Sequence, residues 1–240
     1  MLSVSNLIKR YGKQNAVDDI SFELGGGEVV GLLGPNGAGK STTMKCIVGL
    51  LRKTSGEITI GGHDHLSVEA KRLFSYIPET PYVYDLLTVR EHLQFIAQAY
   101  GVRDWKEKGE ELLNLFELDD KGDKLGRDLS KGMRQKVSIC CALLPDPDIL
   151  FFDEPMIGLD PKAIKNTRQV FRDLKEQGKT ILVSTHLIDS VESIADRIMI
   201  LKNGKIIGND TIQNLKAQAE GSDGATLEDL FLQLTEDARD

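Results

Sequence analysis

Cysteine is scarce in this sequence of 240 residues, and its three copies are Cys46, Cys140 and Cys141. Their spacing matches neither a zinc-binding pattern nor the Cys-x-x-Cys pair of redox proteins. The sequence therefore predicts no disulfide, and it favours cysteines that serve as small core residues in a reducing cytosol.

Long hydrophobic runs are also missing. The longest apolar run, from Ile139 to Leu144, is far shorter than the roughly 20 residues that cross a bilayer. The amino terminus, MLSVSNLIKR, lacks the basic segment followed by a hydrophobic core that marks a secretory signal. We therefore expect that the chain does not cross a membrane itself.

Positive charge is outweighed, because 37 acidic residues against 30 lysines and arginines give a net charge of −7. Non-specific nucleic-acid binding needs a broad cationic surface, so this balance argues against it as the main function. The sequence shows no internal repeat, low-complexity tract or evident linker. With 40% hydrophobic residues, a chain of this length can bury a sizeable core, and we expect one compact unit.

The order of the apolar patterns predicts an α/β fold with a mostly parallel sheet. Near the amino terminus, LSVS, DISFEL and GEITIGG alternate as antiparallel β-structure does. Later, EVVGLLGP, DILFFDEP and TILVSTH are short continuous apolar runs, which are typical of parallel strands buried on both faces. Asn203-Gly204 joins two further apolar runs and predicts a hairpin.

Helices are predicted between and beyond these runs. Asp160 as N-cap, Pro161 at the first position and Gly178 at the end define one helix. Between about residues 79 and 145 two capping boxes open helices with no strand between them, which predicts a helical lobe. These boxes are Thr88 with Glu91 and Asp104 with Glu107.

The segment GPNGAGKST matches the phosphate-loop pattern G-x-x-x-x-G-K-[ST] between a predicted strand and a predicted helix. Its glycines let the backbone curl, so that N–H groups and the helix N-terminus point at a polyphosphate. We expect Lys40 to reach the β- and γ-phosphates and Ser41 to ligate Mg²⁺. The flanking strand and helix disfavour the alternative, a chance glycine-rich turn. The candidate nucleotide-binding residues here are Gly34, Pro35, Asn36, Gly37, Ala38, Gly39, Lys40, Ser41 and Thr42.

Two other predicted strands also end in polar groups. Asp153 and Glu154 end one run, and His186 ends another. The carboxyl ends of parallel strands meet at one edge of the sheet, where ligands bind. We expect Asp153 to hold Mg²⁺, Glu154 to act as general base on the attacking water, and His186 to contact the γ-phosphate. The alternatives are ordinary strand-end acids and a structural or exposed histidine.

The stretch DLSKGMRQKV predicts a helix with an unfavourable beginning. Ser130 is a good N-cap, but Gly132 lies in the first turn. Each cation there costs about 0.3 to 1 kcal/mol against the positive end of the helix dipole. The cations are Lys131, Arg134 and Lys136. The turn fits an anion cap built from Ser130, the N–H groups around Gly132 and the positive helix end.

With these motifs in this order, nearly the whole sequence resembles the nucleotide-binding subunit of an ATP-binding cassette (ABC) transporter. The motifs are KRYGKQNAV, GPNGAGKST, YIPET, LSKGM, DILFFDEP, GLDP and STH. The resemblance implies that Tyr11 stacks on adenine and that Asp160 lies in a loop that communicates across a dimer. It also implies that Ser130 and Gly132 contact, in trans, the γ-phosphate that Lys40 of a second molecule holds.

The resemblance also implies the fold and its division. We expect a P-loop NTPase (RecA-like) core with a mostly parallel sheet, an antiparallel β subdomain and an inserted helical subdomain. One ABC ATPase domain would then span residues 1–240. Its core would cover about 1–78 and 146–210, its helical signature subdomain about 79–145, and a helical extension about 211–240.

Two departures from the family pattern concern the site. Lys131 and Met133 replace the third and fifth residues of the usual LSGGQ signature, whereas Ser130 and Gly132 are kept, so we expect phosphate capping to survive. Glu79 stands where the family usually has a glutamine that touches Mg²⁺ and the attacking water and borders the groove for the transmembrane partner. A carboxylate can bind metal but cannot donate a hydrogen bond, so a metal ligand and an ordinary loop acid both stay open.

These departures and the ending TLEDLFLQLTEDARD resemble the bacterial two-gene export subfamily, whose ATPase and permease are separate chains. The resemblance implies an ATPase that uses ATP and Mg²⁺ and powers a separate permease, as an exporter, by ATP-driven dimerisation of two cassettes. The pair is a homodimer or a pseudo-dimer. The chain would be cytoplasmic, peripheral on the inner face of the cell membrane, with no nucleic-acid partner.

Two other functions compete with this hypothesis. Soluble ABC ATPases of DNA repair or translation share the cassette but carry long coiled coils, zinc cysteines or a second cassette, none of which is visible in the sequence. A GTPase or small-molecule kinase would share only the phosphate loop, and no N-K-x-D guanine-binding motif is present.

Overall fold

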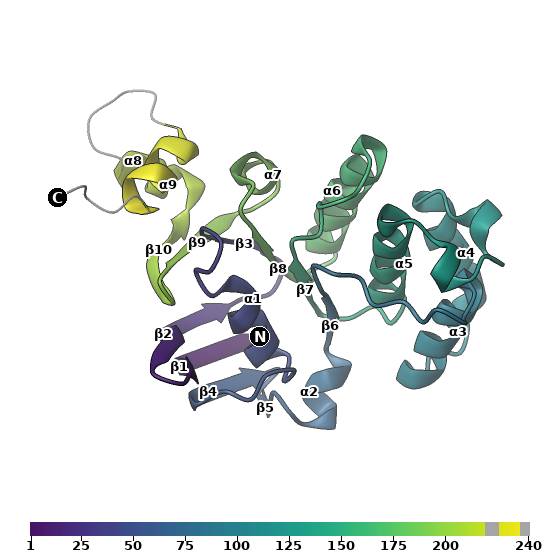
Figure 1. Cartoon of the computed structure of the whole chain (residues 1–240), viewed down its shortest axis with the longest axis horizontal. Helices are drawn as coiled ribbons and strands as arrows, with labels where there is room; N and C mark the ends of the chain where they lie inside the picture. Colours follow the sequence, from purple (N-terminus) through teal and green to yellow (C-terminus); the bar gives the residue numbers. More distant parts are fainter. Residues whose placement is uncertain (219–225, 236–240) are drawn as a thin grey trace.

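The computed structural model describes residues 1–218 and 226–235, in which the strands form two sheets (Figure 1). The smaller sheet is antiparallel, with the order β2-β1-β4-β5. Its strands are β1 (Leu2–Tyr11), β2 (Gln14–Leu24), β4 (Ser55–Ile60) and β5 (His63–Asp64). The antiparallel structure predicted near the amino terminus is therefore confirmed.

The larger sheet has the order β10-β9-β3-β8-β7-β6. Its strands are β3 (Val29–Leu33), β6 (Phe74–Ile77), β7 (Ile149–Asp153), β8 (Thr180–Thr185), β9 (Arg197–Lys202) and β10 (Lys205–Thr211). All neighbours are parallel except β9 and β10, which form the predicted hairpin. Asn203 and Gly204 in its turn have φ angles of 49° and 78°, which asparagine and glycine tolerate best.

Side chains of the larger sheet alternate between two hydrophobic cores. In β7, Ile149 and Phe151 pack in the core that fills the space between the two sheets. Leu150 and Phe152 pack in the core on the opposite face. A strand that is buried on both faces needs apolar residues at successive positions, which is why these strands are continuous apolar runs in the sequence.

Helix α1 (Lys40–Ile47) contributes Met44 and Ile47 to the core between the sheets. Helices α3 to α9 contribute to the core on the other face. Figure 1 shows α3, α4 and α5 as a lobe at one end of the molecule, with α8 and α9 at the opposite end. The remaining helices are α2 (Val68–Arg72), α3 (Val89–Tyr100), α4 (Trp105–Leu115), α5 (Lys131–Leu143), α6 (Pro161–Glu176), α7 (Ile188–Glu192), α8 (Ile212–Gln218) and α9 (Leu227–Thr235). Among the helices of the described residues, none has the length and apolar character that a membrane span requires.

Most of the predicted helix ends are present. Thr88 and Glu91 form their capping box, and Asp160 caps α6 with Pro161 in its first turn. The box predicted at Asp104 is wrong, because Asp104 has φ −99° and ψ 46° instead of the extended conformation, and its side chain caps nothing. The helices predicted over residues 211–240 are present at 212–218 and 227–235, and the intervening and final residues lie outside the described part.

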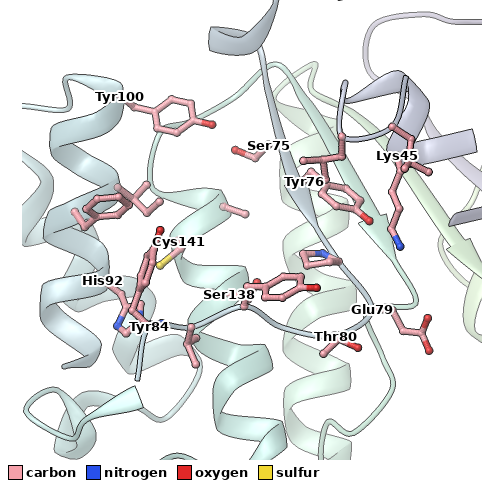
Figure 2. Close-up of a pocket in the computed structure, with 18 residues that line it drawn as sticks. Lys45, Ser75, Tyr76, Glu79, Thr80, Tyr84, His92, Tyr100, Ser138 and Cys141 are labelled. Carbon is pink, nitrogen blue, oxygen red and sulfur yellow. The ribbon is translucent and has the colours of Figure 1, made fainter. Parts of the chain in front are cut away.

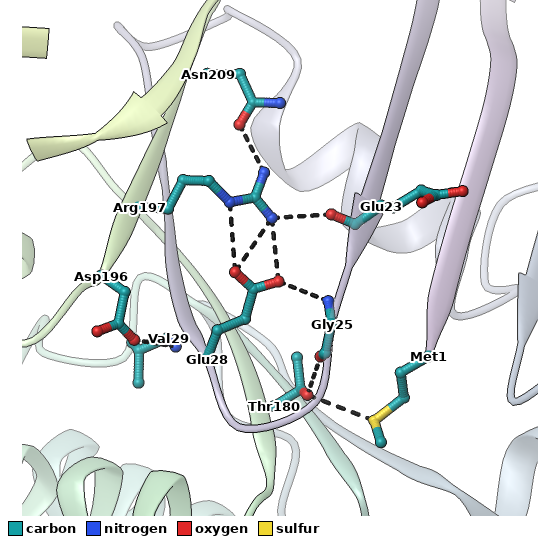
Figure 3. Close-up of polar contacts among 9 residues, drawn as sticks. All are labelled: Met1, Glu23, Gly25, Glu28, Val29, Thr180, Asp196, Arg197 and Asn209. Carbon is teal, nitrogen blue, oxygen red and sulfur yellow. Dashed lines mark hydrogen bonds and ion pairs between the residues drawn. The ribbon is translucent and has the colours of Figure 1, made fainter. Parts of the chain in front are cut away.

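A polar cluster joins the sheets where β3 and β9 begin (Figure 3). Arg197 pairs with Glu28, with Nη2 3.1 Å from Oε1, and Glu28 Oε1 accepts the Gly25 N–H at 2.6 Å. The same guanidinium donates to Asn209 Oδ1 at 2.7 Å and to the Glu23 carbonyl at 2.9 Å. Because these contacts connect β2, β3, β9 and β10, they fix the amino-terminal edge of the larger sheet. The polar groups predicted to act together lie at its other edge.

Candidate functional site

Three neighbouring strands of the larger sheet, β3, β8 and β7, bring their carboxyl ends together. Lys40 follows β3 through the predicted phosphate loop, Asp153 and Glu154 lie at the end of β7, and His186 follows β8. A cavity of about 310 Å³ opens there. It is lined by Ala16, Asn36, Gly37, Ala38, Gly39, Lys40, Ser41, Thr42, Glu79, Glu154, Ile157 and His186. The predicted convergence of the strand ends is therefore observed.

The predicted phosphate loop is a tight curl that depends on its glycines for two different reasons. Gly37 and Gly39 have φ angles of 82° and 108°, which residues with a side chain rarely adopt. Gly34 is needed for space, because a Cβ there would lie 2.4 Å from the Leu201 carbonyl oxygen. The curl turns the start of α1 toward the cavity, so the free N–H groups of this helix end are available to an anion.

Lys40 lies folded back onto its own loop. Its buried Nζ donates to the Gly34 carbonyl at 2.7 Å and to the Pro35 carbonyl at 3.3 Å, and it lies 3.9 Å from Glu154 Oε1. Burial lowers the pKa of Lys40, while the carboxylates of Glu154 and Asp153 oppose that shift. A cation whose partners are mostly neutral carbonyls can exchange them for phosphate oxygens, which are stronger acceptors.

Hydroxyl groups hold the Asp153 carboxylate. Oδ1 accepts from Ser41 Oγ at 2.9 Å and from Ser184 Oγ at 2.5 Å, and Oδ2 accepts from the Tyr76 hydroxyl at 3.3 Å. Mg²⁺ prefers such hard oxygen donors, and it is commonly held by one or two carboxylates together with substrate phosphates. A carboxylate and a hydroxyl that meet beside the phosphate loop therefore fit Mg²⁺.

Glu154 and His186 form a pair at the cavity. His186 Nδ1 lies 2.9 Å from Glu154 Oε1, which places the proton of a neutral ring on Nδ1. Oε2 of Glu154 is buried and has no hydrogen-bond partner within the described ranges. Glu154 also has a φ of 51°, a conformation that costs a non-glycine residue about 1 to 3 kcal/mol and is typical of functional sites. The pair therefore places at the cavity wall a carboxylate that keeps one oxygen without a donor.

The other predicted residues lie at different distances from this cavity. Glu79 lines it, a position that fits a metal ligand and a loop acid alike. Tyr11 does not line it; its side chain is 51% exposed at the end of β1, with Lys9 Nζ 4.8 Å from the centre of its ring. Ser130, Gly132 and Asp160 are likewise outside the lining. Within one molecule, the turn of Ser130 to Met133 (the signature turn) therefore lies apart from the phosphate loop.

The signature turn has the predicted N-cap, and its contacts show why a glycine is needed at position 132. Ser130 Oγ accepts the Met133 N–H at 3.3 Å. A Cβ at Gly132 would lie 2.7 Å from the Gly158 carbonyl oxygen, so glycine permits a close backbone approach there. Lys136 Nζ pairs with Asp160 Oδ2 at 2.8 Å, and this contact lowers the pKa of Asp160. Part of the charge cost predicted for this helix is therefore offset by the acid that caps α6.

The ABC transporter family model matches residues 17–157. The chain belongs to the ABC transporter family. Two relatives from Bacillus subtilis extend the match over nearly the whole chain. The ABC-type transporter ATP-binding protein EcsA is 38% identical over 99% of this chain and 97% of its own length. The SkfA peptide export ATP-binding protein SkfE is 35% identical over 92% of this chain and 93% of its own length.

Solved ABC structures show the same fold. A structure of the ATP-binding subunit of an ABC transporter has a TM-score of 0.93 and 39% identity, and it covers 98% of this chain and 100% of that one. A dimeric post-hydrolysis structure of an ATP-binding cassette bound to ADP and Pi has a TM-score of 0.78 and 26% identity. That match covers 88% of this chain and 98% of the other. The predicted α/β fold, a P-loop core with a mostly parallel sheet, is thus confirmed.

The sequence patterns of this ABC chain did not identify Ser184 and Tyr76 as hydroxyl donors to Asp153. Ser184 lies in the STH motif and Tyr76 in the YIPET motif, so both stood in quoted segments without a role. Strand register identifies Tyr76. Tyr76 on β6 pairs with Phe151 on β7, and Phe151 lies two residues before Asp153. Residues two apart on a strand share a face, and the pairing of β6 with β7 had to be known before this could be seen.

Gly34 and Gly37 give a matched test of the phosphate loop. Gly37→Ala meets no atom within 4 Å but is strained at a φ of 82°, so we expect a loss of about 1 kcal/mol in the free energy of unfolding. Gly34→Ala clashes with a backbone carbonyl of β9, so we expect a loss of about 3 kcal/mol. Urea denaturation of both variants measures the difference. Equal midpoints for the two variants would show that the close approach at Gly34 is unimportant.

Proposed function

We propose that this chain is the ATP-hydrolysing subunit of an exporter and that it powers a separate transmembrane permease through the dimerisation of two cassettes. The observation that carries the proposal is the convergence of Lys40, Ser41, Asp153, Glu154 and His186 at one strand edge. The relatives and the dimeric cassette with ADP and Pi support it. Residues 1–240 would form one ABC ATPase domain, with a core, an inserted helical signature subdomain and a helical extension.

ATP would place its phosphates in the curl of Gly34 to Thr42, with Lys40 on the β- and γ-phosphates and Tyr11 on adenine. Ser41 and Asp153 would hold Mg²⁺, with Glu79 as a further candidate, and the metal would neutralise charge that develops on the phosphates. Glu154 would take a proton from the attacking water while the water oxygen bonds to the γ-phosphorus. The bond from phosphorus to the bridging oxygen then breaks, and ADP and phosphate form. His186 orients Glu154 and contacts the γ-phosphate.

The second half of the site would come from another cassette. Ser130 is exposed at the start of α5, and its helix end is outside the lining of its own nucleotide cavity. A helix N-terminus with a hydroxyl cap and nearby cations can bind an anion, and the anion proposed here is the γ-phosphate of the other molecule's ATP. Asp160, tied to this helix through Lys136, would lie at the same interface. The partner is a second copy or a related cassette.

A groove beside the nucleotide cavity supports a permease as partner (Figure 2). It measures about 640 Å³, and its apolar lining residues include Tyr82, Tyr84 and Phe95, with exposures of 85%, 58% and 45%. Such a patch on a protein surface is typical of an interaction site. Glu79 lines both this groove and the nucleotide cavity, so a permease segment bound here would lie next to the site of hydrolysis. The chain would then be cytoplasmic and held at the inner face of the membrane.

Removing the proposed general base separates binding from hydrolysis. In Glu154→Gln we expect ATP turnover to fall by at least about 100-fold, the lower range for general-base catalysis, while ATP binding persists. Because ATP is then not consumed, the variant should form a dimer that needs ATP. Phosphate release and size-exclusion chromatography with ATP measure the two effects. A monomer in ATP, or turnover at the wild-type rate, would contradict the mechanism.

Blocking the signature turn tests the trans contact. In Ser130→Arg we expect ATP affinity to stay near wild type and the ATP-dependent dimer to be lost, since the side chain fills the anion cap. The change also removes an N-cap, which costs about 1 kcal/mol. Ser67→Arg is the control, because Ser67 caps α2 in the same way through the Ala70 N–H. A dimer that forms equally well with both variants would rule out this role for Ser130.

The groove predicts which surface holds the permease. Phe95→Glu puts a carboxylate in the apolar groove, and we expect it to abolish co-purification of a membrane protein from detergent extracts. Leu115→Glu is the control, because Leu115 is similarly exposed at 40% on α4 but does not line the groove. Recovery of ribosomes or DNA with the wild-type chain, and of no membrane protein, would favour a soluble ABC ATPase instead.

A further inference from the structure

The side chain of Tyr76 lies between the Asp153 carboxylate and the groove. Its hydroxyl lies 3.3 Å from Asp153 Oδ2, and its side chain is part of the wall of the groove. Figure 2 shows Tyr76 on the same wall as Lys45 and Glu79, across the groove from Tyr84 and His92. The residue therefore contacts the proposed metal-binding carboxylate and is exposed to whatever fills the groove.

Strand register explains why Tyr76 can reach this carboxylate. β6 and β7 are parallel, and Tyr76 pairs with Phe151. Phe151 and Tyr76 both pack against the core between the sheets, and Asp153 follows Phe151 by two residues on the same face. A long side chain at position 76 therefore extends along this face toward Asp153. Leucine or valine there would fill the core but would give Asp153 no donor.

The hydroxyl is a dependable donor. A phenol carries an O–H donor, and that of Tyr76 is directed at Asp153 Oδ2. An ionised carboxylate only accepts hydrogen bonds. Donors on both of its oxygens hold it in one orientation. Ser41 and Ser184 donate to Oδ1, and among the described residues Tyr76 donates to Oδ2.

We infer that Tyr76 is a positioning residue that orients the Asp153 carboxylate for Mg²⁺ from the wall of the groove. This inference rests on the proposed Mg²⁺-dependent ATPase function and deepens it. Groups that hydrogen-bond to metal ligands fix the ligand before the metal arrives, and their loss typically weakens metal binding by about 10- to 100-fold. A change in the groove that moves the Tyr76 ring also moves the donor to Asp153, so the residue is placed to transmit occupancy of the groove to the metal site.

Tyr76→Phe tests this role, because it removes the hydroxyl and keeps the ring. The probe is Mn²⁺, titrated into the purified chain with a non-hydrolysable ATP analogue and followed by electron paramagnetic resonance. We expect about tenfold weaker Mn²⁺ binding. The Mg²⁺ concentration for half-maximal ATP turnover should rise by a similar factor, with little change in the rate at saturating Mg²⁺. Affinity for the analogue in EDTA should equal that of wild type.

Thr180→Val is the matched control, because it also removes one hydroxyl hydrogen bond from the same sheet. Thr180 Oγ1 donates to the Gly25 carbonyl at 2.5 Å, at the edge of the sheet far from the strand ends that carry the site. We expect this variant to unfold at a lower temperature and to bind Mn²⁺ like wild type. A Tyr76→Phe variant that behaves in the same way, losing stability but no Mn²⁺ affinity, overturns the inference. A wild-type chain that binds no Mn²⁺ with the analogue overturns the proposed function and the inference together.

Discussion

Parallel pairing of β3, β8 and β7 is the constraint on which the rest of the molecule depends. These strands share a direction and lie side by side, so their last residues meet at one edge, although β3 ends more than a hundred positions before β7 and β8 in the sequence. This pairing alone brings together the phosphate loop, the two acids and His186. The cluster of Arg197 and Glu28 secures the opposite edge, which leaves the carboxyl-terminal edge free for chemistry.

Each charged group at that edge contacts a nearby polar or oppositely charged group. Lys40 is buried, and burial alone would favour its neutral form, but Glu154 and Asp153 oppose this. The acids in turn are held by hydroxyls and by His186, so each charged group has a neutral or opposite neighbour. Bringing phosphates to this place would replace neutral acceptors around Lys40 with charged ones. The acids are therefore held in place before phosphates bind, and Lys40 is the side chain that would exchange its partners.

Local chemistry was enough to predict much of this structure. The turn at Asn203-Gly204, the capping box at Thr88 and the continuous apolar strands depend on residues that are neighbours in the sequence. The failures have two causes, an unexpected backbone conformation and a partner that is distant in the sequence. Asp104 has the residue type of a cap but not its backbone conformation, and Tyr76 finds its acceptor only through the pairing of β6 with β7. Residue type predicts what a group can do, whereas tertiary contacts decide which groups it meets.

Helix α5 is tied to the loop that follows β7 at three successive points. Gly132 approaches the Gly158 carbonyl, Gln135 Nε2 donates to the Pro155 carbonyl at 3.4 Å, and Lys136 pairs with Asp160. All three partners lie in the loop that begins directly after Glu154 and leads into α6. A close-packed contact of this kind transmits displacement instead of absorbing it. Movement of the helical lobe would therefore displace that loop, and the anion proposed at Ser130 would act on the loop that follows Glu154.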